Sequence, residues 1–215
     1  NRGAFQMLKL EGVSFRTADT QLINTLHNQL SHALRNIADD TVMAYVHVVR
    51  ATDDDYPSGT FITDLARWID ESYRSRIEAK RLFRNDLYLT VYMQPRSLPG
   101  GRLAKGVRRA RTSQIEVDQD LLDDLDDKTT QLTRSLSRFR PRKLSIIRDH
   151  RDLLISEPAS VLKQLISGRY EPVPLVHGTI GNAIYTDRVI FGREALEIRH
   201  AAASTYGAMF GIKEY

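Results

Sequence analysis

The residues whose side chains most often perform chemistry are scattered in this sequence, and their spacing forms no recognisable site. His27 and His32 fall on one predicted helix, but their separation turns the two side chains to different sides of it. Three consecutive aspartates, residues 53–55, lack the alternating spacing and the following glycine of a calcium-binding loop. We therefore expect the histidines to be structural or solvent-facing and the aspartates to lie in a solvated loop.

The motifs of nucleotide-binding and hydrolytic enzymes are absent from the sequence. It contains no G-x-x-x-x-G-K-[ST] phosphate-binding loop, no G-x-G-x-x-G, no G-x-S-x-G and no H-E-x-x-H. It also contains no cysteine, which excludes disulfide bonds and thiolate metal sites. We therefore predict no catalytic residue, no cofactor-binding residue and no metal ligand in this chain, and we expect it to hydrolyse no ATP by itself.

Residues 96–114 form a basic stretch with few large apolar residues to anchor it. Its basic side chains are Arg96, Arg102, Lys105, Arg108, Arg109 and Arg111. We expect this loop to be mobile unless a partner orders it. A contact of these side chains with anionic lipid or with an acidic partner is the functional interpretation, and a solvated loop is the alternative.

The basic residues also leave open a nucleic-acid-binding module, which would use residues 96–111 and 134–143. The net charge of +4 is mild and is spread along the chain, so composition alone does not indicate such a function. The stretch 96–114 lacks the aromatic residues on which single-stranded bases stack, which weakens this interpretation.

The chain is organised around residues 17–50, which predict a long amphipathic helix, a polar corner and a strand. Apolar residues recur on one helix face at Leu22, Ile23, Leu26, Leu30, Ala33, Leu34 and Ile37. Thr17 or Asp19 can cap the start of the helix, and residues 42–49 are rich in β-branched side chains. A helix that leads directly into a strand must pack its apolar face on the sheet that the strand enters.

A second amphipathic helix is predicted over residues 60–81. Its apolar face consists of Phe61, Leu65, Trp68, Ile69, Tyr73 and Ile77. We expect this face to lie in the core, with Leu65 and Trp68 against the same sheet as Leu30 of the first helix.

Further helices and strands are predicted along the rest of the chain. A helix over residues 117–139 begins with acidic and ends with basic side chains, which complements the helix dipole. A short helix begins after a capping residue, Ser156, and ends before Gly168. Strands are predicted at residues 4–11, 87–93, 143–148, 188–191, 195–199 and 206–213, with a connector at residues 82–86.

This order of elements predicts an α+β protein with a mixed β-sheet and helices packed on it, and an α/β sheet is the alternative. The 215 residues suffice for one substantial domain, and no apolar run approaches the roughly 20 residues that span a bilayer. We expect residues 1–215 to form a single domain. We also expect a longer parent protein, because the sequence has no initiator Met and stops within a predicted strand.

Five stretches, taken in their order and spacing, resemble the N-terminal region of the large ATPase of bacterial type IV secretion systems, the TrbE/CagE family. They are HALRNIADDTVMAYVHVVR, RNDLYLTVYMQP, LISGRYEPVPL, IYTDRVIFGREALEIR and the terminal GIKEY. The resemblance covers nearly the whole chain, from the strand at residue 4 to Tyr215. It is poorest at residues 96–114, so nothing is carried over to that loop.

The resemblance implies that this chain is the non-catalytic N-terminal docking domain of a secretion ATPase that serves conjugation or effector export. Such a domain docks the motor at the cytoplasmic face of the bacterial inner membrane, as a peripheral protein, and contacts other secretion components and neighbouring copies. The motor domain is absent from this sequence. The resemblance implies no cofactor here, but ATP and Mg²⁺ for the parent protein, which would energise export of DNA or protein. A small enzyme with an unrecognised site is a third class of function, which no acid–base or nucleophile pattern supports.

Overall fold

The computed structural model of the chain describes residues 3–14, 18–53, 56–80, 82–95, 119–201, 203–208 and 210–211. Two compact units, Asn1–Arg142 and Lys143–Tyr215, divide the chain, and each is described by itself. The single domain expected over residues 1–215 stays a prediction. The basic loop of residues 96–114 lies outside the described residues, and with it all of its candidate contact side chains.

The first unit is built on a four-stranded sheet with the strand order β2-β3-β1-β4. The strands are β1 (Ala4–Leu10), β2 (Val42–Thr52), β3 (Phe83–Met93) and β4 (Pro141–Lys143). Both β1 and β2 pair antiparallel with β3. Because Leu8 of β1 and Val46 of β2 both lie opposite Leu89, these three side chains share one face of the sheet.

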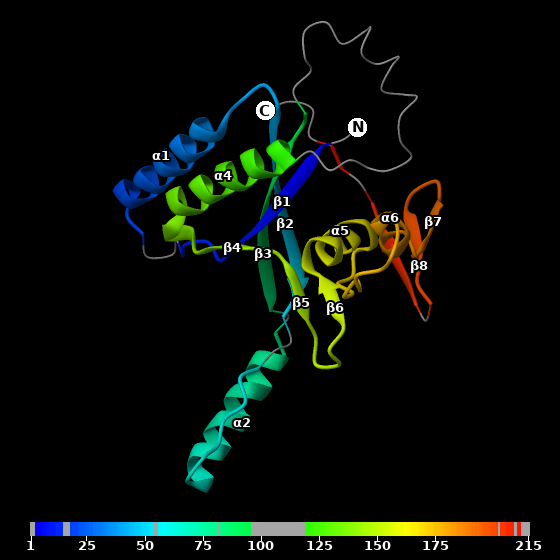
Figure 1. Cartoon of the computed structure of the whole chain (residues 1–215). Helices are drawn as coiled ribbons and strands as arrows, with labels where there is room; N and C mark the ends of the chain where they lie inside the picture. Colours follow the sequence, from blue (N-terminus) through cyan, green and yellow to red (C-terminus); the bar gives the residue numbers. More distant parts are fainter. Residues whose placement is uncertain are drawn as a thin grey trace, which may run out of the picture. The chain divides into compact units, whose positions relative to one another are not determined.

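Two helices, α1 (Thr20–Ile37) and α4 (Gln119–Ser135), lie side by side on that face, with α4 against β1 and β3 (Figure 1). The Gln29 side chain donates to the Ser135 carbonyl over 2.8 Å, and the Lys128 ammonium donates to the Ile37 carbonyl over 3.4 Å. These two contacts show that the helices run antiparallel. The carboxylate of Asp19, one of the two caps expected from sequence, accepts from the Leu22 amide over 2.7 Å.

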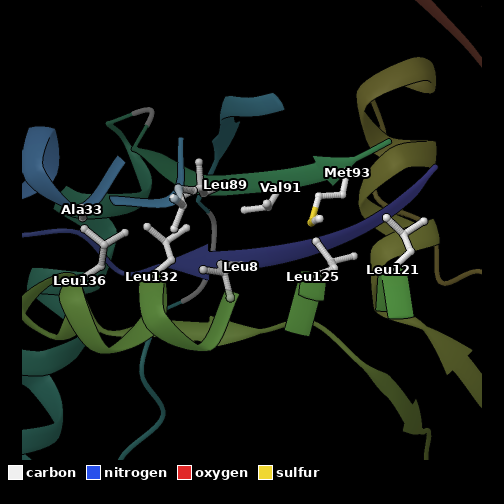
Figure 2. Close-up of a cluster of buried hydrophobic side chains, with 10 residues drawn as sticks. Leu8, Ala33, Leu89, Val91, Met93, Leu121, Leu125, Leu132 and Leu136 are labelled. Atoms are coloured by element: carbon white, nitrogen blue, oxygen red, sulfur yellow. The ribbon is translucent and has the colours of Figure 1, made fainter. Parts of the chain in front are cut away.

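The core of the first unit lies between α4 and the sheet, with the end of α1 at its margin (Figure 2). Its buried members are Leu8, Ala33, Ile37, Leu89, Val91, Met93, Leu121, Leu125, Leu132 and Leu136. Four leucines from the predicted helix of residues 117–139 are therefore in the core: Leu121, Leu125, Leu132 and Leu136. Leu30 packs against this cluster and is half-buried, whereas Leu22 and Ile23 at the start of α1 are exposed.

The second predicted helix forms as α2 (Asp64–Glu78), but the expectation that its apolar face lies in the core is wrong. No described residue of α2 is buried, and Leu65 and Trp68 do not pack on the sheet against which Leu30 of α1 lies. The reason is the length of the β2–β3 pairing, which continues to Thr52 opposite Phe83. The segment between them leaves from the end of these paired strands, so α2 extends beyond the sheet (Figure 1).

The described residues of the second unit form two small antiparallel sheets and two helices. Strands β5 (Ile146–Arg148) and β6 (Leu154–Ser156) form a hairpin, and β7 (Arg188–Phe191), β8 (Leu196–Arg199) and β9 (Ser204–Gly207) form a three-stranded meander. Helix α5 (Glu157–Ser167) is capped by Ser156 and ends at Gly168, as predicted, and α6 (Ile180–Ile184) follows. Ala159, Val173 and Ile184 form a small core.

Gly168 has a φ of 72°, a left-handed conformation in which a side chain is strained.

The predicted α+β class is confirmed, because α1 and α4 pack on a sheet whose described pairings are antiparallel. Some element boundaries differ from the prediction. The connector predicted at residues 82–86 largely belongs to β3, and β9 begins earlier than the predicted last strand. Within the described residues, no helix is both long and apolar enough to cross a membrane.

The strand predicted over residues 143–148 is divided into β4 and β5. The Ser145 carbonyl accepts from the Glu157 amide over 3.0 Å, and the Ser145 amide donates to the Glu157 carboxylate over 3.0 Å. Both backbone groups therefore bind the start of α5 instead of continuing a strand ladder.

Candidate interaction surface

The α2 arm, which we define as residues 56–80, is the described part of the first unit that lies beyond the sheet. Thr63 begins its helix by accepting a hydrogen bond from the Ala66 amide over 3.3 Å. Residues 56–61 precede the helix and lie along its polar side, where all of them except Thr60 line a hollow together with Arg67, Asp70 and Arg74. The chain itself therefore lies against part of the polar side of α2, where Arg67 and Arg74 stay more than half exposed.

Contacts of Tyr56 with Asp70 and Arg74 hold the segment 56–61 against the helix. The Tyr56 hydroxyl donates to Asp70 Oδ1 over 2.8 Å, and this hydrogen bond is the main cause that raises the pKa of Tyr56 above its ordinary value. The Arg74 guanidinium lies 5.5 Å from the centre of the Tyr56 ring and also binds the Glu78 carboxylate over 2.7 Å. Its hydrogen bond to Glu78 is the first cause that raises the pKa of Arg74.

The apolar side of α2 is left uncovered by the described residues. Leu65, Trp68, Ile69 and Tyr73 are between 55% and 66% exposed. Ile62, just before the helix, is also exposed. Single exposed apolar residues are ordinary, but a whole apolar helix face with a Trp and a Tyr is typical of interaction sites. A helix of this length is also only marginally stable in water without packing of that face. The arrangement therefore suits docking of a partner.

The histidines and aspartates considered in the sequence do not gather into a site. His27 and His32 are exposed on α1, and Asp53 lies 3.8 Å from the Arg84 guanidinium, while the next two aspartates fall outside the described residues. No group of three or more metal-ligating side chains occurs within the described residues. In the second predicted basic segment, Arg140 forms an ion pair with Glu11 over 3.2 Å, so the first unit itself engages one of these cations.

One arrangement in the second unit has the residue order of a hydrolytic triad, but its geometry does not support catalysis. The His200 ring lies with Nε2 2.8 Å from the Thr205 hydroxyl and with Nδ1 3.3 Å from Asp187 Oδ2. The ring is nearly buried, and the Nδ1–Oδ2 pair lacks hydrogen-bond geometry. A triad base needs an orienting hydrogen bond and access to substrate. We therefore assign these groups to the packing between β9 and the loop before β7.

The sequence carries one signal for the α2 surface. The apolar stripe of residues 61–77 predicts a face in the core, because an amphipathic helix usually buries such a stripe. Its exposed aromatic residues Trp68 and Tyr73 and its place between two long strands are the features that also fit an exposed arm.

Comparisons with known proteins give a consistent result for both units. Residues 1–99 match the family described as type IV secretion system ATPase VirB4/TrbE, N-terminal domain. Residues 142–215 match the family described as CagE, TrbE, VirB family, component of type IV transporter system. The second match begins next to the boundary between the two structural units.

Individual relatives align along the whole chain. The type IV secretion system protein virB4 of Bartonella henselae is 38% identical over 218 residues, which cover 100% of this chain and 28% of that protein. Protein virB4 of Agrobacterium fabrum is 32% identical over 97% of this chain and 26% of its own length. The type IV secretion system protein PtlC of Bordetella pertussis is 24% identical over 96% of this chain and 26% of its length. The chain thus spans less than a third of each of these relatives.

Proposed function

Since the chain belongs to the VirB4/TrbE family of type IV secretion ATPases, we propose that it is the non-catalytic N-terminal docking domain of its parent protein. The domain holds the motor at the cytoplasmic face of the inner membrane through other components of the secretion system and through neighbouring copies. ATP and Mg²⁺ bind elsewhere in the parent protein, whose ATP hydrolysis energises export.

The observation that carries this proposal is the uncovered apolar side of α2. The segment 56–61 occupies the polar side of the helix, so a partner reaches Trp68 and Tyr73 without displacing the chain's own contacts. Apolar helix faces bind in hydrophobic grooves of partner proteins, and buried Trp and Tyr contribute most of the binding free energy in such interfaces.

The charges on α2 favour a protein partner over a lipid surface. Helix α2 carries acidic as well as basic side chains, and two of its arginines are paired with acids, Arg67 with Asp64 over 3.6 Å and Arg74 with Glu78. Helices that bind anionic membranes usually present an excess of Lys and Arg. We therefore propose that the α2 arm binds an apolar groove on an inner-membrane component of the secretion system.

Site-specific photo-cross-linking in the full-length parent protein tests this function in cells that carry the secretion system. A photo-reactive residue at position 68 should form an adduct with one secretion component. The matched control at position 67 replaces Arg67, which lines the hollow with residues 56–61, and should form little adduct. Equal adducts from the two positions, adducts with lipid alone, or no adduct from position 68 would contradict the proposal.

Replacement of the apolar side chains supplies the functional half of the test. Trp68→Ser and Ile69→Ser in the parent protein should lower secretion and co-purification with the cross-linked component, while the rate of ATP hydrolysis by the purified parent protein stays unchanged. Loss of hydrolysis together with secretion would indicate that α2 supports the motor instead. Steeply salt-dependent DNA binding that is lost with the basic residues of 134–143 would favour the nucleic-acid-binding module.

A further inference from the structure

Strand β2 lies at the edge of the four-stranded sheet, and within the described residues no strand pairs with its outer side. It is long, and its pairing with β3 continues without interruption from Val42 to Thr52. It contains no proline and no bulge, which are the usual features that keep an edge strand from pairing with another chain. This edge is therefore open to strand addition.

Backbone hydrogen bonds at the two ends of β2 show which of its residues face outward. The Gln94 amide donates to the Thr41 carbonyl over 2.9 Å, and the Asp53 amide donates to the Leu82 carbonyl over 2.9 Å. In an antiparallel pair, alternate residues bond to the same neighbour. The odd-numbered residues of β2 therefore bond to β3, and the N–H and C=O groups of Ala44, Val46 and Val48 point away from it.

The side chains at this edge are apolar and exposed on both faces of the sheet. Val46 and Val48 are 67% and 62% exposed on the helix-bearing face. Met43 and Tyr45 are exposed on the other face. Among the Asp, Glu, Lys and Arg side chains, the strand contains only Arg50. An edge of this composition binds a strand that is itself mainly apolar.

We propose that β2 pairs antiparallel with β2 of a second copy of this chain, around a two-fold axis at His47. This inference deepens the proposed function, since it rests on the self-association included there and assigns a surface to it. Full overlap of Val42–Thr52 with itself places Val46 opposite Val48 and Tyr45 opposite Val49. Pairs of β-branched residues, and of an aromatic with a β-branched residue, stabilise antiparallel sheets.

Charge and backbone direction both favour a second copy. In this register Arg50 lies opposite Ala44, so no two like charges face each other. The outward-pointing residues are the even-numbered ones, and full overlap pairs even-numbered residues with even-numbered residues, as hydrogen bonding requires. The same strand therefore supplies both a free edge and a sequence complementary to it, as an isologous interface demands.

Disulfide cross-linking of this chain tests the register, and the absence of cysteine makes the result unambiguous. His47 bonds to β3 through its backbone, so two copies meet at this position as a non-hydrogen-bonded pair with Cα atoms about 4.5 Å apart. His47→Cys should therefore form a disulfide-linked dimer under mild oxidation. Tyr45→Cys is the matched control on the same face of the strand. Its two copies would be roughly 13 Å apart, at about 3.3 Å per residue, and should not cross-link.

Sedimentation equilibrium measures the association itself. The unmodified chain should dimerise, and the double variant Val46→Lys/Val48→Lys should raise the dimer dissociation constant by about tenfold or more, because it places lysines directly opposite each other. Trp68→Ser should leave dimerisation unchanged, because Trp68 lies on α2 and not on β2. This variant therefore distinguishes failure of pairing through β2 from failure of docking through α2. A chain that stays monomeric, equal cross-linking of both cysteine variants, or dimerisation that depends on Trp68 and not on Val46 would overturn the proposal.

Discussion

The hydroxyl of Tyr56 donates a hydrogen bond of 2.8 Å to Oδ1 of Asp70, and this contact holds the segment before α2 against the polar side of the helix. Its consequence is one of orientation. Because the chain's own segment occupies the polar side, the apolar side with Trp68 faces away from it.

The Tyr56–Asp70 contact predicts a loosening of the α2 arm at high pH. The folded-state pKa of Tyr56 lies above its ordinary value of 10.0, so its contribution is present below pH 10 and is lost as the pH rises through the raised pKa. The difference in tyrosinate absorbance between the unmodified chain and Tyr56→Phe reports the ionisation of Tyr56 alone. This difference should appear above pH 10. A titration at or below pH 10 would contradict the hydrogen bond.

Stability should depend on α4 and little on the exposed side of α2. Leu132 is fully buried, so Leu132→Ala should lower the free energy of unfolding of the first unit by about 2–5 kcal/mol. Trp68→Ser truncates a larger side chain, but one that is exposed to solvent. It should therefore change the free energy of unfolding by less than about 0.5 kcal/mol. Leu30→Ala should lie between the two, since Leu30 is half-buried. Denaturant unfolding checks this order, and a large effect of Trp68→Ser would show that α2 packs within the unit.

A buried serine in the second unit should be important for stability despite its size. Ser160 is fully buried, and its hydroxyl donates to the Ser156 carbonyl over 2.8 Å and accepts from the Val173 amide over 2.9 Å. Ser160→Ala leaves the Val173 amide without this partner, which typically costs about 1–3 kcal/mol. The control is Ser75→Ala, which removes an exposed hydroxyl that donates to the Ser72 carbonyl. Equal effects of the two variants on thermal unfolding would contradict the assignment.

The second unit should also lose stability in acid through Glu171. Its carboxylate lies 2.6 Å from the nearly buried Lys163 ammonium, and that hydrogen bond is the main cause that lowers the pKa of Glu171 below 4.5. The ion pair therefore stabilises the folded state above pH 4.5, and this contribution is lost as the pH falls through the depressed pKa. Glu171→Gln should be less stable than the unmodified chain at pH 7, and the difference should shrink in acid. A difference independent of pH would exclude this pair as the cause.

Local sequence determined the helices and their ends. The 3.6-residue periodicity of α1 and α4, the cap of α1 at Asp19, one of two predicted candidates, and the caps of α5 at Ser156 and Gly168 are properties of neighbouring residues. The sequence therefore predicts them. The same holds for the strands β2, rich in β-branched residues, and β3, and for the α+β class.

Tertiary structure alone decided which apolar faces are buried. The stripes of α2 and α4 look alike in the sequence, yet Leu132 is fully buried and Trp68 is largely exposed. The difference arises from strand pairing between distant segments, because β3 pairs with β1 on one side and with β2 along its whole length on the other. That pairing brings α4 onto the sheet and carries α2 beyond its end. Periodicity reports that a helix has an apolar face, whereas contacts between residues far apart in the chain determine what covers it.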